Sequence, residues 1–103
     1  MLENRRRYTR VPMRAHVICI VDSRTMRGVS YNLSQGGILA EVSGLNPNDA
    51  VQLSFRLPVS SVAVDAVGAV VWGDERRRGI QFTNVGSQSQ QSIRQFITER
   101  IER

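Results

Sequence analysis

Arginine is the residue whose type and spacing in this sequence could do chemistry. All 14 basic residues of the 103-residue chain are arginines. Residues 1–14 carry five arginines and one glutamate, a net charge of +4, whereas residues 15–103 carry nine arginines and eight acidic residues, a net charge of +1. A guanidinium pairs with phosphate through two parallel hydrogen bonds and stacks on planar rings. The N-terminal segment therefore predicts an anionic partner: a nucleic acid, a membrane surface or a phosphorylated small molecule.

Two short motifs narrow this chemistry. The segment RRYTR at residues 6–10 contains the pattern R-x-x-x-R, and NLSQGG at residues 32–37 fits the pattern (D/N)-x-S-x-x-G. Each motif alone is weak, because Asn, Ser and Gly are ordinary turn residues and short patterns recur by chance. A second R-x-x-x-R runs from Arg10 to Arg14. We favour the pair Arg6 and Arg10, because the alternative contains Pro12 and ends at the border of the first strand.

The apolar pattern predicts six strands in front of one helix. Strict alternation at residues 51–57 makes this the clearest strand, whereas at residues 27–33 we expect Val29, Tyr31 and Leu33 to share one face. After Gly86 the period changes, and a stripe of Ile93, Phe96 and Ile97 predicts an amphipathic helix packed on one end of the sheet. The six strands are expected at residues 15–22, 27–33, 38–42, 51–57, 62–72 and 79–82.

Short connections between six strands favour closure, because a closed sheet leaves no exposed edge. The expected fold class is therefore all-β: a six-stranded antiparallel β-barrel with a C-terminal α-helix and a flexible basic N-terminal arm. The chain is long enough for one domain, residues 1–103. We divide it into a flexible arm at residues 1–11, a barrel at residues 12–86 and a helix at residues 87–103.

Several classes of function are disfavoured by composition. Cys19, the single cysteine, lies in an apolar run and is expected to be buried; with one histidine beside it, a zinc cluster is nearly excluded. No Ser/His/Asp set and no phosphate-cradling glycine loop before a helix is found, so we expect no enzyme, no metal and no cofactor. No apolar run approaches the ~20 residues of a membrane span, which predicts a cytoplasmic protein without membrane insertion.

The two motifs, in this order on a barrel followed by a helix, resemble the PilZ domain family. The first motif stands just before the first strand and the second just after the second strand. The segments at residues 68–72 (GAVVW) and 79–82 (GIQF) are also similar to the end of the barrel in that family. The resemblance covers residues 3–100, and both motifs together are fairly specific.

The resemblance implies cyclic di-GMP as the ligand. Arg6 and Arg10 would hold phosphates and guanines, and Asn32 and Ser34 would reach a guanine edge; Asn32 stands where many members have Asp but keeps a carbonyl acceptor. Extra arginines beside the first motif can go with two stacked ligand molecules. The predicted ligand-binding residues are Arg5, Arg6, Arg7, Arg10, Asn32, Ser34, Gly36, Gly37 and Trp72.

In such a role the chain would be a ligand-switched adaptor that passes its signal to a separate protein, which the sequence does not identify. The family is linked to motility, biofilm formation, exopolysaccharide production and virulence. Two alternatives stay open: a PilZ-type interaction module that binds no ligand, and a basic barrel that binds RNA or DNA. The nearly neutral body and the six scattered aromatic residues disfavour nucleic acid. Residues 76–78 (RRR) are interpreted as a solvated turn that Asp74 and Glu75 partly balance, with a partner contact as the less favoured alternative.

Overall fold

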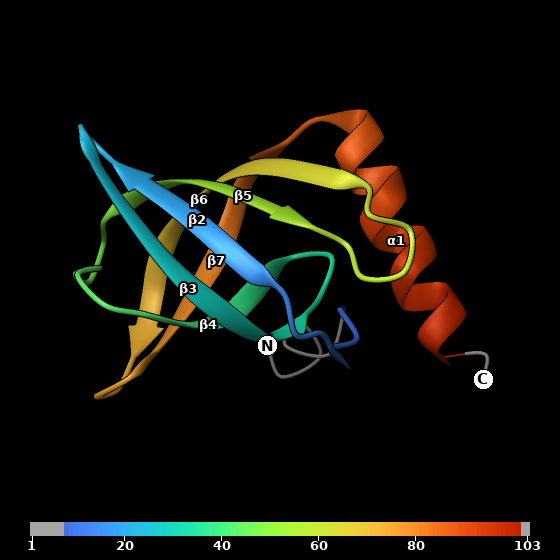
Figure 1. Ribbon diagram of the computed structural model, residues 1–103, viewed down its shortest axis with the longest axis horizontal. Coiled ribbons are helices and arrows are strands. Elements are labelled where there is room, and N and C mark those ends of the chain that lie inside the picture. The colour runs from blue at the N-terminus through green and yellow to red at the C-terminus, as the bar shows by residue number, and fades with distance from the viewer. Residues whose placement is uncertain (1–7, 102–103) are drawn as a thin grey trace.

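Antiparallel hydrogen bonding closes six strands into a barrel in the computed structural model, which describes residues 8–101 (Figure 1). The strands follow the order β3-β2-β5-β6-β7-β4 around the barrel, and a pairing of β3 with β4 closes it. A short seventh strand, β1, pairs with the end of β3. The bounds are β1 Val11–Pro12, β2 His16–Val21, β3 Arg24–Leu33, β4 Gly37–Val42, β5 Ala50–Arg56, β6 Ala63–Gly73, β7 Arg77–Val85 and α1 Ser87–Ile101.

The predicted fold class is confirmed: a six-stranded antiparallel barrel is followed by a C-terminal helix. Two strands are longer than predicted: β3 begins at Arg24 and β7 ends at Val85. The added residues are mostly exposed and polar, so no alternation of apolar residues marks them in the sequence. The predicted start of the barrel at Pro12 also shifts by one residue. Val11 pairs with Leu33 and is buried, so it belongs to the folded body.

The core fills the inside of the barrel. The alternation predicted for residues 51–57 is confirmed, because Val51, Leu53 and Phe55 are buried in this core. Cys19 is fully buried, as expected, and burial raises the pKa of its thiol to about 11. A thiol held in its neutral form is a poor nucleophile, which fits a packing role for this side chain.

Helix α1 covers one end of the barrel (Figure 1). Its predicted apolar stripe is confirmed: Ile93, Phe96 and Ile97 are buried, and the helix contacts β6 and β1. A helix of this length is marginal in water alone, so this packing is what stabilises it. Within the described residues, no helix is both long enough and apolar enough to cross a membrane.

A β-bulge in β3 changes which residues face outward. Ser30 pairs with Ala40 and Asn32 pairs with Leu39, so Tyr31 is an extra residue in the ladder. The expectation that Val29, Tyr31 and Leu33 share one face is therefore wrong. Ser30 and Leu33 point into the core, whereas Tyr31 is exposed, because the extra residue shifts the alternation by one position.

A second bulge, in β6, acts on Trp72 in the same way. Val70 pairs with Ile80 and Trp72 pairs with Gly79, which leaves Val71 as the extra residue. Val64, Ala66 and Val70 face the core at even positions, and simple alternation would place Trp72 there too. Instead, the indole lies on the outer face and is 48% exposed.

Ser30 is a fully buried polar residue that holds the chain leading into β2. Its hydroxyl donates to the carbonyl of Met13 (2.6 Å) and accepts from the backbone N–H of Ala15 (3.0 Å). Its own backbone N–H donates to the carbonyl of Ala15 (2.9 Å). These bonds fasten residues 13–15 along β3 and so determine where the N-terminal segment meets the barrel.

Replacing Ser30 by alanine leaves the Met13 carbonyl and the Ala15 N–H without this partner inside the protein. An unsatisfied buried group costs about 1–3 kcal/mol, so we expect Ser30→Ala to lower the free energy of unfolding by that amount. Urea denaturation measures it. Ser23→Ala, in the exposed turn between β2 and β3, is the matched control and should change stability by less than about 0.5 kcal/mol. Equal effects of the two substitutions would contradict the role of Ser30.

Candidate functional site

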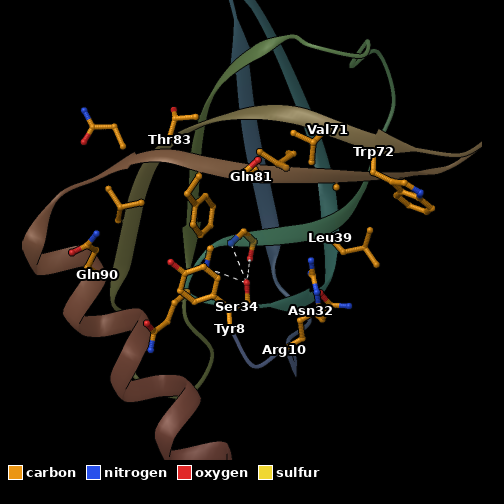
Figure 2. Close-up of a pocket in the computed structure, with 18 residues that line it drawn as sticks. Tyr8, Arg10, Asn32, Ser34, Leu39, Val71, Trp72, Gln81, Thr83 and Gln90 are labelled. Atoms are coloured by element: carbon orange, nitrogen blue, oxygen red, sulfur yellow. Dashed lines mark hydrogen bonds between the residues drawn. The ribbon is translucent and has the colours of Figure 1, made fainter. Parts of the chain in front are cut away.

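The bulges at Tyr31 and Val71 bring residues from four strands into one row on the outer face of the barrel. Trp72 pairs with Gly79, Gly79 with Leu39, and Leu39 with Asn32. Figure 2 shows Leu39 between Trp72 and Asn32. A Cβ atom on Gly79 would lie 3.3 Å from Cβ and 3.7 Å from Cε3 of Trp72, so the glycine leaves room for the indole beside it. An amide, an aliphatic side chain and an aromatic ring therefore stand on the same surface.

A pocket of about 780 Å³ lies over this row, between the N-terminal segment and the start of α1 (Figure 2). Its volume falls within the roughly 300–1,000 Å³ of typical small-molecule sites. The N-terminal segment contributes Tyr8 and Arg10, and α1 contributes Gln90. The rest of the lining comes from residues 34–37 and from β3, β4, β6 and β7. Residues 79–85 of β7 supply a continuous stretch of this lining.

Arg10 and Asn32 meet at the edge of this pocket. The guanidinium of Arg10 donates to the side-chain carbonyl of Asn32, with an Nη1–Oδ1 distance of 3.0 Å. The two motifs, 22 residues apart in sequence, are thus joined by a direct side-chain contact. The Asn32 amide can donate through its nitrogen while its oxygen accepts from Arg10. The pair therefore offers a cation and both kinds of hydrogen-bonding atom.

Ser34 organises the turn between β3 and β4. Its side chain is nearly fully buried, and its hydroxyl accepts from the backbone N–H groups of Gly36 and Gly37, each at 3.1 Å. The backbone N–H of Ser34 also donates to the carbonyl of Gly37 (2.9 Å). Ser34 thus lines the pocket while its hydroxyl is bonded within the turn, so its first effect is on the shape of residues 34–37.

The paired glycines allow two close approaches around this turn. A Cβ atom on Gly36 would lie 2.7 Å from Cδ2 of Tyr8, so the tyrosine ring rests directly on the glycine backbone. A Cβ atom on Gly37 would collide with the carbonyl oxygen of Ile80 on β7. Gly36 therefore gives the N-terminal segment a place to dock, and Gly37 lets β4 and β7 pack closely.

The structure brings together every predicted site residue that it describes. Arg5, Arg6 and Arg7 lie outside the described residues. The lining residues that sequence reasoning missed come mostly from β7 and α1, where no motif marks them. Tyr8 was also missed, although its position inside the first motif could have indicated it. The predicted residues that line the pocket are Arg10, Asn32, Ser34, Gly36, Gly37 and Trp72.

The lining suits a planar, polar and anionic molecule. Arg10 supplies positive charge, the Tyr8 and Trp72 rings offer surfaces for stacking, and the amides of Asn32 and Gln81 offer donors and acceptors. Among residues 8–101, no group of three His, Cys, Asp or Glu side chains is placed to hold a metal ion.

Comparison with protein families matches residues 4–99 to the family described as PilZ domain. No curated protein sequence matches the chain significantly. Among solved structures, the PilZ domain of YcgR from Escherichia coli with c-di-GMP is similar, with a TM-score of 0.71 and 20% identity. That similarity covers 92% of this chain and 90% of the other chain.

Two further solved structures have the same fold. The Bacillus subtilis inhibitor of motility, MotI/DgrA, has a TM-score of 0.79 and 19% identity over 94% of this chain. This chain spans about half of MotI/DgrA, 52% of its length. The PilZ domain of CeSA from a cellulose-synthesizing bacterium has a TM-score of 0.70 and 18% identity, covering 92% of this chain and 99% of that one.

We expect Gly36→Ala to release Tyr8 from the turn, because the added Cβ occupies the space of the ring. Nuclear Overhauser contacts between the Tyr8 ring protons and residue 36, present in the wild type, should disappear in the variant. Gly86→Ala is the matched control, since a Cβ there meets no atom within 4 Å. Retention of the Tyr8 contacts in Gly36→Ala would show that the ring does not depend on the glycine.

Proposed function

The chain belongs to the PilZ domain family, and from this premise we propose that it is a receptor for cyclic di-GMP that binds in the pocket between the N-terminal segment and the barrel. The observation that carries the proposal is the hydrogen bond from Arg10 to Asn32 at the pocket edge. It joins the family's two motifs in space, next to stacking surfaces and further amides. The proposal is supported by the common pocket that the predicted ligand-binding residues within residues 8–101 line.

The chemistry of the ligand matches this lining. Cyclic di-GMP carries two phosphates and two guanines, so its receptor needs cations, hydrogen-bonding groups for base edges, and planar surfaces. Arg10 would pair with a phosphate or with guanine O6 and N7. Asn32 would bond a second base edge through its amide, and Trp72 would stack on a ring. Arg5, Arg6 and Arg7 precede Tyr8 directly in sequence, and their positive charges would favour the same anionic ligand.

Two of the similar structures support this direction. The YcgR domain is a PilZ domain with c-di-GMP, and MotI/DgrA is an inhibitor of motility. We propose that this chain acts as an adaptor, in which ligand binding at the N-terminal segment creates a new surface for a protein partner. The proposed role is recognition without catalysis, and the output would be control of motility, biofilm formation or exopolysaccharide production. Its cytoplasmic location stays a prediction.

Calorimetric titration of cyclic di-GMP into the protein tests the proposal, with GTP as the competing nucleotide. We expect saturable binding that GTP does not reproduce, and the midpoint of the titration distinguishes one ligand from two per chain. Arg10→Ala should weaken binding about 10- to 100-fold, because a hydrogen bond to a charged group contributes about 1.5–3 kcal/mol.

Arg14→Ala is the matched control for this titration. Arg14 is exposed, ends the second R-x-x-x-R pattern and does not line the pocket, so its loss changes the net charge by the same amount as the loss of Arg10. Binding should therefore survive in Arg14→Ala. Equal losses in the two variants would assign the effect to net charge, and no binding by the wild type would favour the interaction module that binds no ligand.

The adaptor role makes a separate prediction about the N-terminal segment. If the ligand orders this segment, amide exchange in residues 4–10 should slow when cyclic di-GMP is added. Exchange in β5, whose residues do not line the pocket, is the internal reference and should stay unchanged. Unchanged exchange in residues 4–10 at saturating ligand would reject the switch while leaving the receptor in place.

A further inference from the structure

The three consecutive arginines at residues 76–78 are not a uniformly solvated turn. Arg78 is half-buried, and its guanidinium donates to the carbonyls of Leu45 (2.9 Å) and Asp74 (2.6 Å). Arg77 is engaged with Asp74 and Trp72. Arg76 donates its backbone N–H to the Asp74 carboxylate, and within residues 8–101 this is the hydrogen bond that the structure gives it. The prediction of a solvated turn is therefore wrong for Arg78, whereas Arg76 and Arg77 are exposed as expected and Asp74 balances Arg77.

Asp74 is the centre of this turn. One carboxylate oxygen accepts from the backbone N–H groups of Arg76 (3.0 Å) and Arg77 (2.7 Å). The other accepts from the Arg77 guanidinium through Nε (3.0 Å) and Nη2 (2.9 Å). The backbone bonds from Arg77 and Arg76, and the Arg77 guanidinium, lower the pKa of Asp74 to about 2. The carboxylate thus holds the Arg77 side chain in one direction.

That direction leads to the indole of Trp72. The central guanidinium carbon of Arg77 lies over the ring, 5.5 Å from its centroid, within the range of a cation–π contact. Trp72 lines the pocket described above, whereas Arg77 does not. Arg77 lines a separate surface hollow with Tyr31 and residues 74–76. The indole thus lines the pocket, while the cation over its ring does not.

We propose that Arg77, held by Asp74, is a positioning residue that fixes the Trp72 ring as a stacking surface for a guanine of the ligand. The inference rests on the proposed function and deepens it by assigning the specificity for a planar base to a turn outside the pocket. Trp72 is nearly half exposed and stands beyond a bulge, so core packing alone does not determine its ring orientation. A cation over the ring restricts the rotamers that the side chain adopts.

A double-mutant cycle with calorimetric titration of cyclic di-GMP tests this role. Arg77→Ala should weaken binding about 2- to 5-fold, which is the ~0.5–1 kcal/mol of an exposed cation–π contact converted to a ratio. In the Trp72→Ala background the same substitution should have no further effect, because Arg77 acts through the ring. An undiminished loss in that background would mean that Arg77 contacts the ligand directly, and would overturn the proposal.

Arg76→Ala is the matched control, since it removes one positive charge from the same turn and leaves the Asp74–Arg77 pair in place. Binding should be unchanged in Arg76→Ala. Equal weakening by Arg76→Ala and Arg77→Ala would assign the effect to net charge and would also overturn the positioning role.

A second measurement on the free protein separates this inference from the proposed function. Trp72 is the single tryptophan of the chain, so intrinsic fluorescence reports on it alone. Arg77→Ala should increase acrylamide quenching and lower the anisotropy of Trp72, whereas Arg76→Ala should match the wild type. This result would support the positioning of Trp72 even if cyclic di-GMP failed to bind, and equal quenching in all three proteins would overturn it.

Discussion

Closure of the barrel through the pairing of β3 with β4 is the constraint on which the site depends. A shift of one residue in the pairing of a strand would turn its core side chains to solvent, so the register of a barrel strand is strongly determined. β3 is paired with β2 and β4, and β7 with β4 and β6, so the registers across β3, β4, β7 and β6 are determined together. The row from Trp72 to Asn32 exists because every one of these registers is determined.

Within this frame, the bulges at Tyr31 and Val71 bring Asn32 and Trp72 to the outer face of the barrel, where both line the pocket. Without these bulges, the regular alternation of side chains along β3 and β6 would point Asn32 and Trp72 into the core, where an unpaired amide and a large indole are costly to place. The extra residue at Tyr31 turns Leu33 into the core and leaves Asn32 on the outer face. The extra residue at Val71 leaves Trp72 on the outer face. Bulges beside functional sites commonly re-aim side chains in this way.

The position of the N-terminal segment follows from a buried hydroxyl rather than from its charge. Ser30 holds residues 13–15, and the two-residue strand β1 then runs along the end of β3. This path delivers Arg10 to Asn32 and lays Tyr8 on Gly36. The direction of the chain at residues 11–15 is determined by the contacts of Ser30 and by the pairing of β1 with β3. This direction brings Arg10 of the first motif to Asn32 of the second.

The sequence by itself determined the class of fold and the identity of the two motifs. Strict alternation at residues 51–57 and the helical stripe of Ile93, Phe96 and Ile97 are local patterns, and local patterns are readable because each side chain reports its own burial. Tyr8 and the β7 residues of the pocket were not readable, because their role depends on which strands become neighbours. Only the tertiary structure decided that Trp72 and Asn32 face outward in one row and that Arg77 lies over the indole. The physical reason is that a bulge appears only when two strands pair, so no single strand carries its signature.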